Sequence, residues 1–307
     1  MRIFRSIPAM REACRERFCL PGGRAALGLV PTMGALHAGH VSLVRAARQR
    51  CAVVAATIFV NPLQFGPRED LDRYPRPFAE DCALLEREGV DLLFAPAVEA
   101  MYPHGQGATF VETPGITARL DGRFREGHFR GVETVVAKLF HIVEPDFAFF
   151  GQKDAAQVAV LRAMVRDLDF ALELVVCPTV REPDGLALSS RNRYLSSAER
   201  RDALALSRSL FSLVEAAGES GAAGESGAAV PLLLAGLRER LLSAPGVTLE
   251  YAEIVHPDTL EPVRDLARGA LAAVAARVGE TRLIDNILLE PVFDRAGQTA
   301  ALEETMR

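Results

Sequence analysis

The sequence predicts an α/β fold in which a doubly wound parallel sheet is followed by a smaller α+β domain. Its 307 residues are enough for two domains that each bury a core. Apolar residues make up 49 % and charged residues 24 %, the balance of a globular chain rather than a disordered one. Short apolar runs alternate with amphipathic segments up to about residue 180, and the pattern changes beyond that point.

The expected strands of the first domain are apolar throughout, as strands buried on both faces should be. They span residues 25–30, 51–60, 90–95, 147–150 and 172–177. Amphipathic segments between them predict helices over residues 40–50, 78–88, 132–142 and 155–168. This alternation predicts a Rossmann-like domain over residues 1–180, with ligands at the carboxyl ends of its strands.

The remaining residues, 181–307, predict a small α+β domain. Its expected helices cover residues 197–217 and 230–242, and its expected strands cover residues 247–255 and 281–289. Residues 269–278 are ambiguous between helix and strand because alanine dominates them. The phrase Ala-Ala-Gly-Glu-Ser-Gly occurs twice over residues 216–227 and predicts a mobile loop between the two helices, up to about residue 229.

Charge, cysteines and hydropathy exclude several classes of protein. With 35 basic and 40 acidic residues the net charge is -5, so no overall positive field recruits nucleic acid. The 5 cysteines form no Cys-x-x-Cys, which argues against a disulfide framework or a zinc site. No apolar run approaches the roughly 18 residues of a membrane span, and the first residues lack the apolar core of a signal peptide. We therefore expect a cytoplasmic protein with no nucleic-acid or membrane partner.

Two histidines follow the first expected strand. Residues 31–40 read Pro-Thr-Met-Gly-Ala-Leu-His-Ala-Gly-His, which puts His37 and His40 at the start of the next helix. The N–H groups and dipole of a helix N-terminus suit a phosphate, and imidazoles three residues apart add donors on the same face. The phrase His-x-Gly-His, in which Gly39 admits a ligand close to the backbone, resembles the signature of nucleotidyltransferases that activate acids with ATP. Turn chemistry alone is the alternative for so short a match.

Polar groups also follow the second and fourth strands. Asn61-Pro signals a turn that places Gln64 on the ligand side, where its amide can serve a substrate with carboxylate and hydroxyl groups. After the fourth strand, Gly151 allows a tight turn into a helix. Lys153 then offers a compact cation for polyphosphate, and Asp154 can orient Lys153 or accept from a ribose hydroxyl. A polar loop residue and a surface ion pair are the structural alternatives.

Two further polar segments carry weaker signals. Residues 185–192 end in Ser-Ser-Arg-Asn at the inferred domain junction, where hydroxyls and a guanidinium can bind polyphosphate or simply cap a turn. Residues 119–130 contain four arginines and His128. Capture of phosphate or carboxylate, solvated loop charge and a contact between subunits are all open for this basic segment.

Together these segments resemble the pantoate–β-alanine ligase (pantothenate synthetase) family, in the same order, over about residues 25–195. The motifs are Pro-Thr-Met-Gly-Ala-Leu-His-Ala-Gly-His, Asn-Pro-Leu-Gln-Phe, Gly-His-Phe-Arg-Gly-Val-Glu-Thr-Val-Val, Phe-Gly-Gln-Lys-Asp and Leu-Ser-Ser-Arg-Asn. The family makes a pantoyl adenylate and pyrophosphate from ATP and pantoate, and β-alanine then displaces AMP. The resemblance also implies Mg²⁺, a homodimer, a first domain that binds nucleotide and pantoate, and a second domain that acts as a lid.

The resemblance implies a role for each matching residue. The nucleotide-binding residues would be Met33, Gly34, Ala35, Leu36, His37, Ala38, Gly39, His40, Gly151, Gln152, Lys153, Asp154, Val180, Leu188, Ser189, Ser190 and Arg191. The catalytic residues would be His37, His40, Lys153, Ser189, Ser190 and Arg191. Pantoate would be held by Gln64, Gln157 and Asn61, and no motif identifies a metal ligand. Adenylation builds charge on phosphorus, so positioned donors should contribute more than a proton from His40.

The chain departs from the family pattern in two places, and two alternatives stay open. Glu126 stands where the family usually has proline, and the Ala-Ala-Gly-Glu-Ser-Gly repeat is a local insertion. One alternative is another nucleotidyltransferase of the same superfamily, which acts on a different small acid and needs no convergence of Gln64 and Gln157. The other is a catalytically silent nucleotide-binding or assembly protein. Intact Lys153 and Arg191, together with both histidines, argue against it.

Overall fold

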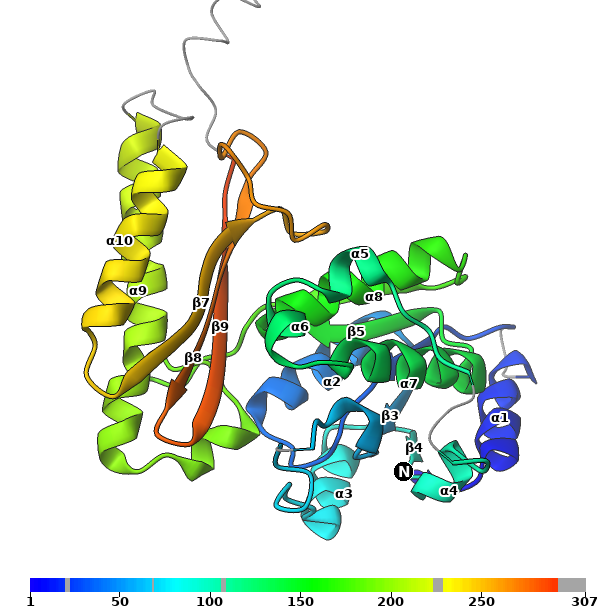
Figure 1. Ribbon diagram of the computed structural model, residues 1–307. Coiled ribbons are helices and arrows are strands. Elements are labelled where there is room, and N and C mark those ends of the chain that lie inside the picture. The colour runs from blue at the N-terminus through cyan, green and yellow to red at the C-terminus, as the bar shows by residue number, and fades with distance from the viewer. Residues whose placement is uncertain (20–22, 68, 106–108, 223–228, 292–307) are drawn as a thin grey trace, which may run out of the picture. The chain divides into compact units, whose positions relative to one another are not determined.

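The computed structural model describes residues 1–19, 23–67, 69–105, 109–222 and 229–291 (Figure 1). The chain divides into two compact units. The first unit contains Met1–Val180 and Leu188–Ser190, and the second contains Arg181–Ala187 and Arg191–Arg307. The backbone therefore passes between the units three times, after Val180, after Ala187 and after Ser190.

Six parallel strands form the sheet of the first unit. They are β1 (Arg2–Phe4), β2 (Leu27–Val30), β3 (Val53–Thr57), β4 (Leu92–Phe94), β5 (Phe147–Gly151) and β6 (Glu173–Cys177). Their order across the sheet is β1-β4-β3-β2-β5-β6, so the strand order reverses between β2 and β5. Such a reversal leaves a crevice at the carboxyl ends of the two strands. The predicted fold class is confirmed.

Helices connect these strands. They are α1 (Ile7–Arg15), α2 (Ala38–Arg50), α3 (Phe78–Arg87), α4 (Val98–Met101), α5 (Pro114–Thr117), α6 (Asp121–Phe124), α7 (His128–Val143) and α8 (Ala155–Asp167). Short 3-10 turns are η1 (Glu16–Cys19), η2 (Pro62–Gln64), η3 (Gln152–Asp154) and η4 (Ser190–Tyr194). In Figure 1, α2 and α8 lie on opposite sides of β5. All four predicted helices are confirmed, and α7 begins earlier than predicted, at His128.

Apolar side chains of α2 and α3 pack against one face of the sheet and form a buried cluster with it. Val44 of α2 and Leu85 of α3 pack in one cluster with Phe149 of β5. Gly28 in β2 leaves room for the Cys51 side chain at the end of α2, because a Cβ there would lie 2.9 Å from Cys51 Sγ. Full burial of each such apolar side chain contributes roughly 1.5–3 kcal/mol. The loops at the carboxyl edge therefore project from a well-packed base.

The sequence patterns miss the N-terminal strand and helix and the short helices α4, α5 and α6. The short edge strand β1 and helix α1 are not predicted, although Ser6 caps α1 by accepting a hydrogen bond from Ala9 N. Gly151 has φ -86° and ψ 135°, an extended conformation open to any residue. The expected tight turn from strand to helix is made by η3, and its geometry does not require glycine at this position.

The second unit is an antiparallel sheet packed against two helices. Its elements are α9 (Ser197–Ala222), α10 (Ala229–Ser243), β7 (Val247–Val255), β8 (Ala270–Val278) and β9 (Thr281–Leu289). The alanine-rich strand β8 lies between β7 and β9. Its residues Ala272, Val274 and Ala276 join the helix-facing core. The ambiguous segment is thus a strand, where small side chains fit beneath helices.

The repeat segment is only partly a loop. Helix α9 runs to Ala222, so the prediction of a loop from residue 216 is wrong for the first copy. The helix therefore continues through both Gly218 and Gly221. Residues 223–228 lie outside the described residues. Among the residues that the structure does describe, no helix has both the length and the apolar character required to cross a membrane.

A hairpin occupies the passages between the units. Arg181 and Ala187 form an antiparallel bridge in the second unit, and Leu188 N donates to Val180 O at 3.0 Å in the first. Arg181 also makes two hydrogen bonds to buried Asp285, at 2.7 and 2.9 Å. The base of the hairpin thus belongs to one unit and its tip to the other.

Candidate active site

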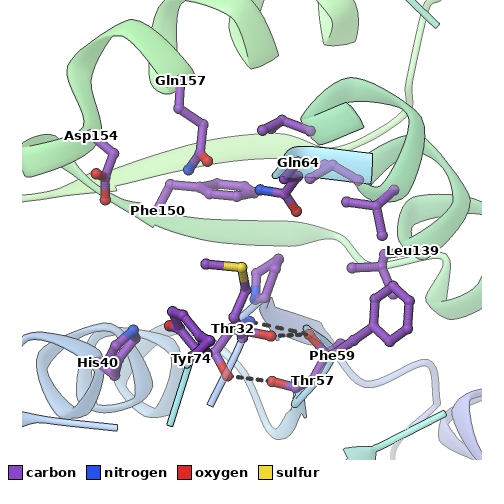
Figure 2. Close-up of a pocket in the computed structure, with 15 residues that line it drawn as sticks. Thr32, His40, Thr57, Phe59, Gln64, Tyr74, Leu139, Phe150, Asp154 and Gln157 are labelled. Carbon is purple, nitrogen blue, oxygen red and sulfur yellow. Dashed lines mark hydrogen bonds between the residues drawn. The ribbon is translucent and has the colours of Figure 1, made fainter. Parts of the chain in front are cut away.

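A cavity of about 140 Å³ lies at the carboxyl ends of β2 and β5 (Figure 2). It is lined by Pro31, Thr32, Met33, His40, Thr57, Phe59, Gln64, Tyr74, Val132, Val135, Val136, Leu139, Phe150, Asp154 and Gln157. In Figure 2, Gln64, Phe150 and Gln157 lie above the cavity, and Thr57 and Phe59 lie below it. The reversal of strand order therefore positions a pocket of mixed polarity, as expected for a small ligand.

Five residues predicted from the sequence line this cavity together. They are Met33, His40, Gln64, Asp154 and Gln157. They come from four separate segments: the turn after β2 with the start of α2, then η2, η3 and α8. The structure thus brings predicted nucleotide-binding and pantoate-binding residues to one place.

The apolar wall of the cavity comes from α7 and is not predicted. Val132, Val135, Val136 and Leu139 follow one another at the i, i+3, i+4, i+7 spacing of a single helix face. This signal was present in the sequence. The same spacing also describes a helix face buried in a protein core, so periodicity alone does not identify it as a ligand wall.

The two histidines cap the helix that they begin. His37 Nδ1 accepts a hydrogen bond from Gly39 N at 3.1 Å, and His40 Nδ1 accepts one from His37 N at 3.3 Å. A ring nitrogen that accepts carries no proton, so each neutral ring keeps its proton on Nε2. Gly39 is required because a Cβ there would lie 2.9 Å from the His37 ring. The His-x-Gly-His phrase thus puts the Nε2–H groups of both rings at a helix N-terminus.

The charge state of His40 follows from its surroundings. Burial lowers the pKa of His40 to about 3, and neighbouring His37 and Lys153 act in the same direction against Asp154. His40 is therefore neutral near pH 7. The interaction with Lys153 and Asp154 also places the start of α2 beside the segment after β5, where Lys153 Nζ lies 3.4 Å from Asp154 Oδ1.

The turn between β2 and α2 is held by two outside contacts. Thr32 Oγ1 donates to the carbonyl of Thr57 at 2.5 Å, which ties the turn to the end of β3. Ala35 has φ 52°, a left-handed conformation that costs roughly 1–2 kcal/mol for a residue with a side chain. Ala35 N and Leu36 N both donate to buried Asp81 of α3 at 2.8 Å. Asp81 was missed in the sequence, since nothing local connects it to this turn.

The loop that carries Gln64 rests on α7. A Cβ on Gly131 would lie 2.1 Å from the carbonyl oxygen of Leu63, so only glycine allows this contact. Asn61 is fully buried and does not line the cavity, and its Nδ2 donates to Gln64 Oε1 and to the carbonyl of Gly131 at 3.0 Å each. The structure therefore places Asn61 behind Gln64 rather than against a ligand.

The basic segment 119–130 supports the same loop. Arg125 donates to both carboxylate oxygens of Glu69, at 2.7 and 2.6 Å. Arg125 also donates to the carbonyl of Gln64 at 3.3 Å, and His128 Nδ1 donates to that carbonyl at 2.8 Å. For these two residues the geometry favours internal bracing over anion capture.

The remaining predicted nucleotide residues divide between the two units. Leu188 lies against the start of α2, because a Cβ on Gly39 would be 4.0 Å from Leu188 Cβ. Val180 pairs with Leu188 through the backbone, and Ser189 and Ser190 follow in the first unit. Arg191 belongs to the second unit, and its role stays a prediction.

The comparisons with known proteins agree on one family. A family model described as pantoate-beta-alanine ligase matches residues 2–288. The chain is 54 % identical to a pantothenate synthetase of Koribacter versatilis, over 97 % of this chain and 99 % of that one. It is 60 % identical to a pantothenate synthetase of Acidobacterium capsulatum, over 87 % of each.

Solved structures give the same result. A pantothenate synthetase from Thermus thermophilus matches with a TM-score of 0.86 and 50 % identity, over 95 % of this chain and 100 % of that one. A pantoate-beta-alanine ligase from Francisella tularensis, described as complexed with beta-gamma ATP and beta-alanine, matches with a TM-score of 0.73. Its identity is 32 %, over 94 % of this chain and 97 % of that one.

Proposed function

The chain belongs to the pantoate–β-alanine ligase family, and we propose that the cavity at the ends of β2 and β5 is its pantoate site. The enzyme is an AMP-forming ligase that makes pantothenate from pantoate, β-alanine and ATP through a pantoyl adenylate. One observation carries the assignment of the cavity: the amides of Gln64 and Gln157 meet an apolar wall beside His40.

Pantoate matches the two kinds of surface in this cavity. It carries two methyl groups on one carbon, and the valines of α7 and Leu139 offer them an apolar wall. Its carboxylate and two hydroxyls need polar partners, which Gln64 and Gln157 supply. A different small acid without this combination would leave either the apolar wall or an amide unused.

In the first step, a carboxylate oxygen of pantoate attacks the α-phosphorus of ATP, and pyrophosphate leaves. Negative charge grows on the phosphate oxygens during this exchange. We assign the Nε2–H groups of His37 and His40, with the positive end of the α2 dipole, to stabilise that charge. Because His40 is neutral, it acts as a hydrogen-bond donor and not as an acid.

The leaving pyrophosphate requires cations. We assign Lys153 to this role from its place after β5 beside His40, and Ser189, Ser190 and Arg191 by the motif that they share with the family. In the second step, the amine of β-alanine attacks the acyl carbon. A C–N bond replaces the acyl C–O bond, and AMP leaves with that oxygen.

The family resemblance implies Mg²⁺, and the described residues fit a metal that ATP brings with it. Among them, no group of three or more His, Cys, Asp or Glu side chains is placed to hold an ion. Mg²⁺ binds through one or two carboxylates with substrate phosphates and water, and Asp154 lines the cavity beside His40. We assign Asp154 as the carboxylate nearest such an ion. When bound, Mg²⁺ neutralises phosphate charge.

Three further proposals rest on the family resemblance. The enzyme is a homodimer, it acts in the cytoplasm, and its second unit is a lid over the nucleotide. Light scattering after size-exclusion chromatography tests the first. A mass equal to that of one chain would contradict it.

Pyrophosphate exchange into ATP tests the function directly. With Mg²⁺ and pantoate present and β-alanine absent, labelled pyrophosphate should enter ATP, because the adenylate forms reversibly. Addition of β-alanine should then release AMP and pantothenate. Exchange that ignores pantoate, or that requires another acid, would contradict the proposal.

A further inference from the structure

We infer that Gln64 faces the cavity only as a hydrogen-bond donor, and that Asn61 and Tyr102 are positioning residues that fix this polarity. The inference rests on the proposed function, because it concerns how the same cavity distinguishes the oxygens of pantoate. A free glutamine amide can offer either its oxygen or its nitrogen to a ligand by rotating its terminal group. The contacts behind Gln64 remove that choice.

Two backbone groups with fixed roles orient Asn61. The carbonyl oxygen of Gly131 can only accept, so the Asn61 atom 3.0 Å from it is Nδ2. The N–H of Leu63 can only donate, so the Asn61 atom that it reaches at 3.3 Å is Oδ1. In a reversed amide, Oδ1 would face the carbonyl oxygen of Gly131 and Nδ2 would face the N–H of Leu63, and both clashes would be fully buried. The orientation of Asn61 therefore follows from the backbone alone.

The orientation of Asn61 determines that of Gln64. The second proton of Asn61 Nδ2 is donated to Gln64 Oε1 at 3.0 Å, so Gln64 Nε2 is the end of the amide left for the cavity. Tyr102 completes the chain by donating its hydroxyl proton to Asn61 Oδ1 at 2.8 Å. All four hydrogen-bonding positions of Asn61 are then occupied, and none remains for a substrate.

The surroundings keep this chain in one state. Burial raises the pKa of Tyr102, so its hydroxyl stays protonated and can donate. The carbonyl of Gln64 accepts from His128 and Arg125, and Gly131 contacts the backbone of the same turn. The backbone of Gln64 is thus fixed, and its side-chain amide can turn away only by breaking the buried hydrogen bond from Asn61 Nδ2.

A fixed donor has a chemical consequence. With its Oε1 bound by Asn61, Gln64 offers Nε2 to an oxygen that accepts, such as a carboxylate oxygen or a hydroxyl lone pair of pantoate, in preference to a hydroxyl proton. Gln157 differs, since its side chain makes no hydrogen bond to another residue in the described part of the chain. Its amide is therefore able to turn and accept the hydroxyl protons. The two glutamines have separate tasks.

The variant Gln64→Glu tests the polarity directly, with Gln64→Ala as its reference. At pH 8 the ionised carboxylate can accept but not donate, so the pantoate KM should rise on the order of 100-fold, at least as much as for Gln64→Ala. As the pH falls towards 5 the protonated carboxyl regains a donor, and KM should recover for Gln64→Glu only. A pantoate KM within about threefold of the wild type at pH 8 would show that Gln64 accepts, and would overturn the inference.

Asn61→Asp tests whether Asn61 acts through Gln64. An aspartate cannot donate to Gln64 Oε1, so the Gln64 amide should reverse and the pantoate KM should rise about 10- to 100-fold while the ATP KM changes less than about twofold. In a Gln64→Ala background the same substitution should add almost nothing. If the KM increases of Asn61→Asp and Gln64→Ala multiply in the double variant, Asn61 does not act through Gln64, and the positioning role is overturned.

Tyr102→Phe provides a milder test that preserves packing. Loss of the hydroxyl should raise the pantoate KM about 3- to 10-fold with little change in kcat, and this effect should also vanish when Gln64 is alanine. Tyr251→Phe removes a buried tyrosine hydroxyl from the second unit and should leave both values unchanged. An effect of Tyr102→Phe on the pantoate KM that persists in the Gln64→Ala background would show that Tyr102 does not act through Asn61 and Gln64.

Failure of the inference is distinguishable from failure of the proposed function. If the wild type shows no pantoate-dependent exchange, the function is wrong. If the wild type exchanges normally but Gln64→Glu binds pantoate well, the function stands and only the donor polarity of Gln64 is wrong.

Discussion

The two loops that bound the cavity reach their positions by different means. The turn after β2 contains a left-handed alanine, Ala35, and depends on one carboxylate, Asp81, that accepts two of its N–H groups. The loop after β3 has no left-handed residue among its described positions, and it is fixed by packing on Gly131 and by hydrogen bonds from Asn61, Arg125 and His128. The first loop contains a strained residue whose N–H is held by the Asp81 carboxylate, while the second contains none and is held by packing and several hydrogen bonds.

This difference matches the ligands proposed for each side. On the phosphate side, the left-handed turn directs Ala35 N and Leu36 N to Asp81, and this fixes the start of α2, where the two imidazoles carry the donors. A small-acid site needs one amide held in one orientation, and rigid packing does this better than a strained turn. Local strain and dense packing are thus two routes to preorganisation, and they should fail in different ways.

The largest effect should come from breaking the packed loop at its closest contact. In Gly131→Ala the new Cβ would meet the Leu63 carbonyl at 2.1 Å, so η2 must move and the Asn61 hydrogen bond to residue 131 is lost. We expect a loss of about 3 kcal/mol in the free energy of unfolding, measured by urea titration, and a pantoate KM raised more than about tenfold.

Gly115→Ala is the matched control, because a Cβ there meets nothing within 4 Å. It should leave both the unfolding free energy and the pantoate KM almost unchanged. Equal stability of the Gly131 and Gly115 variants would show that the loop after β3 is not held by this contact.

The next effect should come from removing the support that Asp81 gives to the strained turn. Asp81→Asn replaces one of two acceptors with an NH₂ group that faces a backbone N–H. The unfolding free energy should fall by roughly 1–3 kcal/mol, and the rate of adenylate formation should fall with it, since the turn leads into His37. Quenched-flow measurement of adenylate checks this.

Asp72→Asn is the control, because Asp72 lies near this region but makes no such contact with the turn. If the two asparagine variants form adenylate equally fast, the turn does not depend on Asp81.

A smaller effect should appear in the pH dependence of the unfolding free energy, through Glu133 of α7. Burial raises the pKa of Glu133 to about 6, against hydrogen bonds from Thr113 that lower it. Its protonated form is favoured in the folded state, so its contribution is fully present below about pH 4.5 and is lost as pH rises through about 6. Glu133→Gln should abolish this loss, worth about 2 kcal/mol above pH 6. Thermal unfolding from about pH 4.5 to 7 measures it, and parallel curves for the two proteins would refute the prediction.

The smallest kinetic effect of pH near neutrality should be seen at His40, at the start of α2. Burial lowers the pKa of His40 to about 3, so its neutral form contributes stability that is present above pH 6.5 and lost as pH falls towards 3. Between about pH 6.5 and 8 no proton is exchanged at His40, and kcat for pyrophosphate exchange should show no ionisation of this residue. A His40→Gln comparison that removes a kinetic pKa in this range would instead assign His40 a charged role.

The strands and the polar residues just after them could be predicted from the sequence, because buried parallel strands are continuously apolar and their ends are marked by turns. Gln64 and Asp154 were found in this way, and the cavity now contains both. Their chemical roles stay proposals. The supporting residues were missed for a physical reason. The hydrogen bonds of Asp81 to Ala35, of Tyr102 to Asn61 and of Asn61 to Gly131 join positions 46, 41 and 70 apart, and such contacts leave no periodic trace.

The three passages of the backbone between the units have a consequence for modularity. A fragment that ends at Val180 would contain the sheet and Gln64 but would lack Leu188, Ser189 and Ser190, which belong to the same unit. Exchange of the second unit between relatives by a single junction would likewise separate Arg181 from Asp285 or leave the serines behind. Each unit is compact, but their residues alternate along the chain between Val180 and Arg191. A recombinant between two family members therefore has to take the hairpin, and the chain segments directly before and after it, from the same parent.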